Sequence, residues 1–112
     1  MDFTKEAIND VSLFRVNVPR ATMNEAEEFK FSLSEEINNG VKNLVVDLSD
    51  CDYIDSTFLG TLVVTLKKVT AQGGDLRLIG FKPAVRSMFE LTRMYRVFET
   101  FESKDEAVKS FS

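Results

Sequence analysis

The chain has 112 residues, of which 44% are hydrophobic and 29% are charged, with a formal net charge of -4. This size suits a single domain, and the composition excludes a disordered chain. The absence of a Lys/Arg cluster argues against nucleic-acid binding. A lone cysteine, Cys51, excludes an intramolecular disulfide, and no stretch resembles a signal peptide or a membrane span, so we expect one cytoplasmic domain over residues 1–112.

The first part of the chain predicts a hairpin followed by a helix. Residues 3–7 and 11–18 have the character of two short strands, with a turn-prone Asn-Asp pair between them. Pro19 ends the second strand. Apolar residues then recur at helical spacing, which predicts a helix that starts near Asn24 and stops at the Asn-Asn-Gly sequence 38–40.

The middle of the chain predicts a buried strand and a second helix. Residues 44–48 form a compact apolar run, as expected for a central strand that is covered on both faces. Almost directly afterwards, an apolar stripe at helical spacing extends from Ser56 to about Gln72. The pair Gly73-Gly74 ends this helix.

The last part of the chain continues the alternation of strands and helices. Residues 76–81 and 97–101 are expected strands, and Pro83 lies in the first turn of the helix between them. Ser103 and Glu106 fit a capping box that opens a short terminal helix. This order predicts an α/β fold with a mostly parallel, mixed five-stranded sheet, an N-terminal hairpin and about four helices.

In such a fold, the loops at the carboxyl ends of the strands carry function, because helix N-termini with unpaired N–H groups converge there. The loop 48–56 meets this description. Around it the chain contains the strand 44–48, Asp55-Ser56-Thr57 with Leu59-Gly60, Gly73-Gly74 before 76–78, and Pro83-Ala84-Val85 with Met88-Phe89. In this combination of motifs the chain resembles the STAS family of bacterial anti-sigma factor antagonists.

The resemblance covers nearly the whole chain and implies a single STAS domain that switches between partners. The unphosphorylated protein would bind an anti-sigma factor that is also a serine kinase of the histidine-kinase-like ATPase fold. Phosphorylation of the serine after the aspartate, here Ser56, would release it, and a metal-dependent serine phosphatase would reset it. Thr57 is the lesser candidate for the phosphoacceptor.

Physical chemistry independently favours Ser56, because a phosphate at a helix start meets the positive end of the helix dipole. It adds about -1.5 to -2 charges to a surface that a partner must approach. A structural alternative stays open for each residue. Ser56 is either the acceptor or merely the N-cap of the helix. Asp55 is either a cap or turn residue, or it shapes the acceptor loop or helps position a metal or nucleotide bound to the kinase.

The second helix has a small, nearly uncharged face opposite its apolar stripe, which is either a docking surface or an ordinary helix face. This face comprises Thr57, Gly60, Thr61, Val64, Lys68 and Ala71. Phe58 replaces a glycine that is common in antagonists, and it either joins the core or serves as an aromatic anchor for a partner.

A second departure from the antagonists is the segment 19–22, where many of them have acidic residues near the phosphorylated serine. Arg20 reverses that charge. It indicates either a partner with a different surface or an arginine that steadies the phosphoserine. We therefore count Arg20 and Thr22 among the candidate partner-binding residues.

An enzyme is not expected, because the chain has no histidine to activate a serine. We also expect no cofactor and no metal, since the loop carboxylates are typical of solvated turns, and we expect Cys51 to be a half-buried packing residue. The alternative function is a structural STAS subunit of a signalling scaffold or a lipid-transport complex, without a phosphate. The sequence does not name the kinase, the phosphatase or the client.

Overall fold

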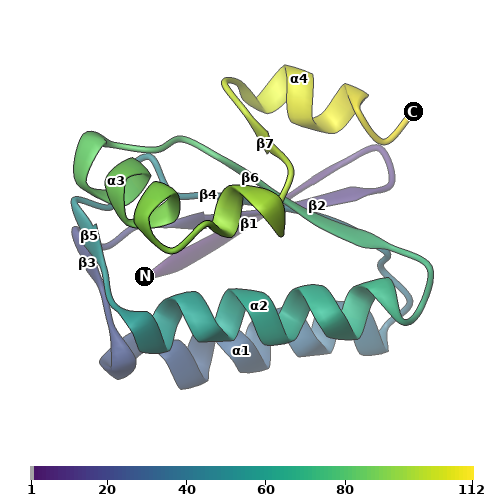
Figure 1. Ribbon diagram of the computed structural model, residues 1–112. Helices are drawn as coiled ribbons and strands as arrows, with labels where there is room; N and C mark the ends of the chain where they lie inside the picture. Colours follow the sequence, from purple (N-terminus) through teal and green to yellow (C-terminus); the bar gives the residue numbers. More distant parts are fainter. Residues whose placement is uncertain (1) are drawn as a thin grey trace.

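A computed structural model describes residues 2–112 and has a twisted sheet with helices on both faces (Figure 1). In chain order the elements are β1 (Phe3–Ile8), β2 (Val11–Val16), β3 (Arg20–Ala21), α1 (Met23–Asn38), β4 (Asn43–Asp47), β5 (Tyr53–Ile54), α2 (Ser56–Thr70), β6 (Asp75–Ile79), α3 (Pro83–Leu91), the 3-10 helix η1 (Met94–Arg96), β7 (Thr100–Phe101) and α4 (Lys104–Lys109).

The main sheet confirms the predicted α/β topology. Its strand order is β1-β2-β4-β6-β7, with an antiparallel β1/β2 hairpin and parallel pairing elsewhere. A second, two-stranded sheet was not predicted. In this small sheet β3 pairs in parallel with β5, with Arg20 opposite Tyr53 and Ala21 opposite Ile54.

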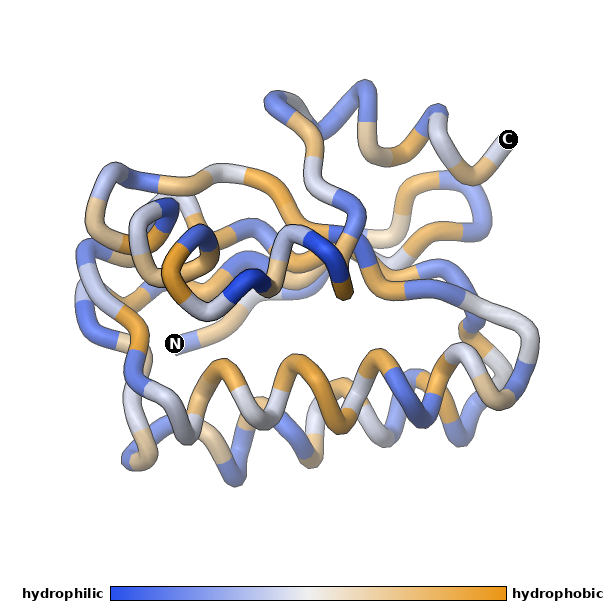
Figure 2. The backbone as a smooth tube through the Cα atoms, in the orientation of Figure 1, coloured by the Kyte–Doolittle hydropathy of each residue, from blue (hydrophilic) through white to orange (hydrophobic). Residues whose placement is uncertain are grey.

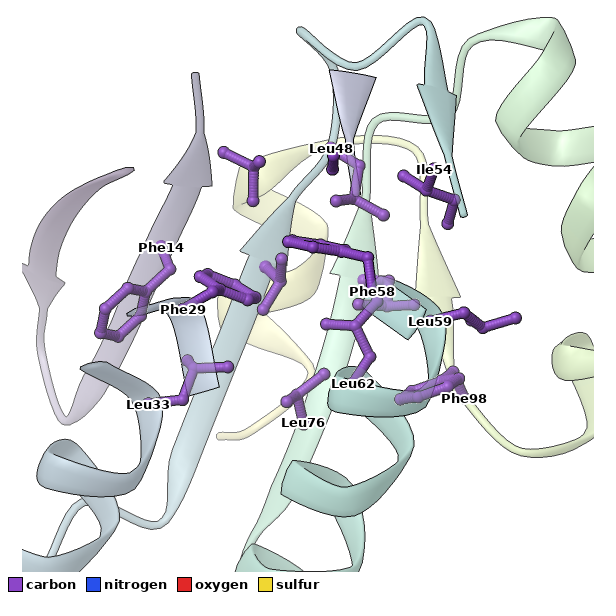
Figure 3. Packing of buried hydrophobic residues seen from close by; sticks show 14 of the residues in the cluster. Phe14, Phe29, Leu33, Leu48, Ile54, Phe58, Leu59, Leu62, Leu76 and Phe98 are labelled. Atoms are coloured by element: carbon purple, nitrogen blue, oxygen red, sulfur yellow. The ribbon is translucent and has the colours of Figure 1, made fainter. Parts of the chain in front are cut away.

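The core lies mainly between the sheet and the paired helices α1 and α2, which run side by side along one face (Figure 1). Figure 3 shows how Phe14, Phe29 and Phe58 meet in this layer. Along β4, Leu44 and Val46 face this larger cluster, whereas Val45 faces a smaller one that α4 covers. The central strand is therefore buried on both faces, as its unbroken apolar run predicts.

Several element boundaries differ from the predictions. β2 ends at Val16, two residues early, and the last strand is reduced to Thr100–Phe101, because Val97 closes η1. Figure 2 shows apolar and polar residues interspersed along α2, and most of the apolar ones are buried. Within residues 2–112, no helix has both the length and the apolar character needed to cross a lipid bilayer.

Candidate phosphoacceptor and partner-binding site

Asp55 joins the N-terminal ends of the two paired helices. Its Oδ1 accepts a hydrogen bond from the backbone N–H of Phe58 at 2.8 Å, which caps α2. Its Oδ2 accepts from the N–H of Met23, the first residue of α1, at 2.9 Å. One carboxylate therefore satisfies an unpaired donor of each helix, and both donors lie at positive dipole ends. The cap is Asp55, so the reading of Ser56 as the N-cap is wrong.

Ser56 is instead the first residue of α2, and its side chain is exposed. Its hydroxyl has no hydrogen-bond partner among residues 2–112, and neither do the backbone N–H groups of Ser56 and Thr57. A hydroxyl that caps nothing is available for modification without loss of a structural contact. The free N–H groups beside it are suited to a phosphate, because helix N-termini bind anions.

Backbone hydrogen bonds hold the segment after β2 against this loop. The N–H of Asp52 donates to the carbonyl of Pro19 at 2.7 Å, and that of Asp55 donates to Ala21 at 3.0 Å. These bonds, together with the β3/β5 pairing, place residues 19–23 next to the start of α2. The candidate residues of both segments therefore share one end of the molecule.

The two candidates in this segment have different environments. The Arg20 guanidinium lies 4.4 Å from the centre of the exposed Tyr53 ring, a cation–π contact that leaves the charge at the surface. The half-buried Thr22 forms a capping box with Glu25: its N–H and hydroxyl donate to Glu25 Oε1 at 2.8 and 3.0 Å. Thr22 therefore serves α1, whereas Arg20 is accessible to a partner.

The carboxylates of the loop between β4 and β5 lie at the surface, as expected of a solvated turn, and also have specific partners within the protein. Arg15 holds Asp50 through two hydrogen bonds of 3.0 and 2.9 Å, which lowers the pKa of the Asp50 carboxyl and raises the pKa of Arg15. Lys82 donates to Asp52 at 2.8 Å, and this bond raises the pKa of Lys82. Asp47 accepts from the N–H of Ser49 at 2.9 Å. Each carboxylate of the loop therefore has a specific protein partner.

Cys51 is fully buried and not half-buried as predicted. Burial raises the pKa of its thiol to about 12, with the carboxylates of Asp50 and Asp47 adding to the shift. The thiol lies 3.9 Å from the carbonyl oxygen of Val16. A neutral, enclosed thiol has little reactivity, so Cys51 is a packing residue.

The small face of α2 is narrower than the helical spacing predicted. Two of its expected members are buried: Thr61 is only 7% exposed, and Phe58 stacks on Phe29 of α1 with ring centres 5.1 Å apart. Helix α2 packs against α1 as well as the sheet, so its buried arc is wider than one stripe. The prediction that Thr61 lies on the exposed face is wrong, and of the two alternatives for Phe58 the structure confirms the core and not the aromatic anchor, so Phe58 is not a partner-binding residue. The expected members of the face that do reach the surface are Thr57, Gly60, Val64 and Lys68, together with Ala71 just after the last residue of the helix.

The fold and this loop are those of a known domain family. The family model described as the STAS domain matches residues 2–107, and the chain belongs to this family. A relative in Bordetella bronchiseptica, BtrV, has the provisional name of an anti-sigma factor antagonist. It is 30% identical to this chain over 86 residues, which cover 77% of this chain and 74% of BtrV.

Solved structures agree with the family assignment. A crystal structure of a Thermotoga maritima protein with the same provisional name superposes with a TM-score of 0.90, at 27% identity, over 96% of this chain and 92% of that protein. The antagonist SpoIIAA, in its unphosphorylated form, shares the fold with a TM-score of 0.84 at 17% identity, over 97% and 95% of the two chains. SpoIIAA from Bacillus is also solved in a phosphorylated form.

Proposed function

We propose that this STAS domain is a partner-switching anti-sigma factor antagonist and not an enzyme. In this proposal the unphosphorylated chain binds an anti-sigma factor that is also a serine kinase of the histidine-kinase-like ATPase fold. Phosphorylation of Ser56 releases the chain, and a metal-dependent serine phosphatase restores it. The observation that carries the proposal is the exposed Ser56 hydroxyl, which follows the cap Asp55 and has no structural role of its own within residues 2–112.

A local mechanism accounts for the release. A phosphate on Ser56 adds about -1.5 to -2 charges beside free N–H groups of α2, which favour it. The same charge and bulk oppose a partner that packs on this end of α2. The domain itself does not need to rearrange, because Asp55 already holds the cap.

The surface for the kinase combines the accessible residues of both neighbouring segments. We propose that it comprises Thr57, Gly60, Val64 and Lys68 of α2, with Arg20 beside them. Val64 is 49% exposed and lies among small or half-buried neighbours, so it is the apolar centre of this surface. Asp55 shapes the acceptor loop through its two hydrogen bonds to the first turns of α1 and α2.

The test is a phosphorylation assay with a candidate serine kinase of the histidine-kinase-like ATPase fold from the same organism, followed by peptide mass spectrometry. We expect one phosphate on Ser56, none in Ser56→Ala, and normal phosphorylation in the matched variant Thr57→Ala. A phosphate on Thr57 alone would contradict the assignment. A stable complex without any phosphorylation would favour the alternative, a structural STAS subunit.

Binding is measured separately by calorimetry with the same kinase. Val64→Glu should weaken the complex by roughly 2 kcal/mol or more, because an unpaired charge in a packed interface is costly. The thermal melt of this variant should match that of the wild type. Wild-type affinity for Val64→Glu would show that the kinase docks elsewhere.

A further inference from the structure

Two surfaces outside the Ser56 site have exposed aromatic residues that the proposed function does not use. The first is the outer face of α1, where Phe31 is 65% exposed although its neighbours Phe29 and Leu33 are buried. Glutamates at positions i-4, i-3 and i+4 share the face of Phe31 and are all exposed. We call Phe31 with Glu27, Glu28 and Glu35 the acidic knob.

The second surface lies where α3 turns into η1. It has a hollow of about 380 Å³ lined by Phe81, Arg86, Phe89, Glu90, Tyr95 and Thr100. Leu91 beside it is 84% exposed and Tyr95 is 54% exposed. We call this hollow, together with Arg86, Arg93 and Arg96, the basic socket.

The charge of the socket is opposite to that of the knob and of the whole chain. Three exposed guanidinium groups belong to the socket, and among its lining residues only Glu90 is acidic. The guanidinium group of Arg86 makes only weak contacts within the chain: it lies 3.9 Å from the carboxylate of Glu102 and 5.6 Å from the centre of the Phe81 ring. Only Arg86 lines the hollow itself, and Arg93 and Arg96 follow α3 in the turn and in η1, so the three arginines outnumber the one acidic lining residue in a chain whose net charge is -4.

Backbone geometry adds an independent observation at the socket. Arg93 has a φ of 59° at the turn between α3 and η1, a left-handed conformation that favours glycine. An arginine at such a position is unfavourable for the fold. Arg93 directly follows the C-cap of α3, where helices often end in this conformation with glycine, and non-glycine residues held in it cluster at functional sites.

We infer that the basic socket binds the acidic knob of a second copy of this chain, with Phe31 in the aromatic hollow and the glutamates against the arginines. The two surfaces cannot meet within one chain, because α1 lies behind α2 in Figure 1, whereas α3 and η1 lie at the front. A contact between different surfaces of identical chains is heterologous. It therefore forms open chains or rings and not a closed dimer.

The experiment measures the weight-average mass of the purified chain by sedimentation equilibrium. Between about 10 µM and about 1 mM at low salt we expect this mass to at least double, which corresponds to a weak contact with a dissociation constant on the order of 100 µM. Because the contact is between exposed charges, about 0.5 M salt should abolish the increase. A wild-type chain that stays monomeric at about 1 mM in low salt would overturn the inference.

Charge reversal tests the pairing itself. The knob variant Glu27→Lys with Glu28→Lys and the socket variant Arg93→Glu with Arg96→Glu should each stay monomeric, with circular dichroism as the check on folding. An equimolar mixture of the two variants should associate again, because each reversed surface then meets its complement. Phe31→Ser should remain monomeric without any change of charge.

Two outcomes would refute the pairing. Association that survives both reversals would come from a different surface, and a mixture that stays monomeric would show that the knob and the socket do not bind each other. The result is independent of the Ser56 switch, since neither charge-reversal variant changes Ser56, Asp55 or the exposed face of α2. Phosphorylation of both variants by the kinase should therefore equal that of the wild type.

Discussion

The first turn of α2 and the turns that follow it have different tasks within one helix. Ser56 and Thr57 are exposed and their side chains make no hydrogen bond within residues 2–112, whereas Phe58, Thr61 and Thr65 are buried. The side chains therefore change from exposed to buried between Thr57 and Phe58. The proposed acceptor thus lies at the end of a well-packed helix, so substitutions in the two parts should separate switching from folding.

The largest effect on folding is expected for Phe58→Ala. The ring is fully buried and stacks on Phe29, so its removal leaves a cavity between α1 and α2 (Figure 3). We expect a loss of about 3–5 kcal/mol in the free energy of unfolding, measured by urea denaturation. Phe31→Ala is the matched control, because this phenylalanine is exposed and its removal should cost no more than about 0.5 kcal/mol. Equal losses would mean that the helix pair is packed differently.

A second prediction compares the same new side chain on two adjacent faces of α2. Thr61→Arg introduces a large charged group at a buried position and should cost about 2 kcal/mol or more. Val64→Arg, three residues further along the helix on its exposed face, should leave the thermal melt nearly unchanged while it removes kinase binding. Comparable melts for the two variants would place Thr61 on the surface, as the sequence alone suggested.

The wrong placement of Thr61 on the exposed face shows what helical spacing can and cannot predict. Helical spacing identified the residues of α2 that face the sheet, but it contains no information on a second helix alongside. Thr61 and Thr65 are polar, so they do not extend an apolar stripe, yet α1 covers the side of α2 that carries Phe58. The buried arc was therefore underestimated, while the strands, the four helices and the parallel order followed from local patterns.

The structural details of the candidate acceptor loop could not be predicted from the sequence. Alternation of apolar residues predicts strands of five or six residues, but the β3/β5 pair has two residues in each strand and depends on a neighbour distant in sequence. Asp55 and Ser56 are both common caps, and only the geometry assigns that role to Asp55. The second bond of Asp55, to Met23, connects elements more than thirty residues apart and has no sequence signal.

The third prediction concerns this double cap. Asp55→Ala removes an acceptor from the first turns of both α1 and α2 and should cost about 1–2 kcal/mol in urea denaturation. Asp55→Asn keeps one carbonyl oxygen and should lose less, while the phosphorylation of Ser56 slows in both because the acceptor turn is less well fixed. A full loss of phosphorylation with unchanged stability would instead indicate a direct contact of Asp55 with the kinase.

The smallest effect on folding and the largest on switching are expected together in Ser56→Asp. An acidic group in the first turn interacts favourably with the helix dipole and displaces no hydrogen bond of the serine, so stability should change by less than about 0.5 kcal/mol. The added charge mimics the phosphate in part, so calorimetry should show weaker binding to the kinase. Thr57→Asp is the control, since it places the same charge one position further along the exposed turn. If both variants lose binding equally, the surface merely rejects negative charge; if only Ser56→Asp loses binding, the switch is specific to the residue that follows the cap. A marked drop in the melting temperature of Ser56→Asp would give Ser56 a structural role and contradict its assignment as a freely presented acceptor.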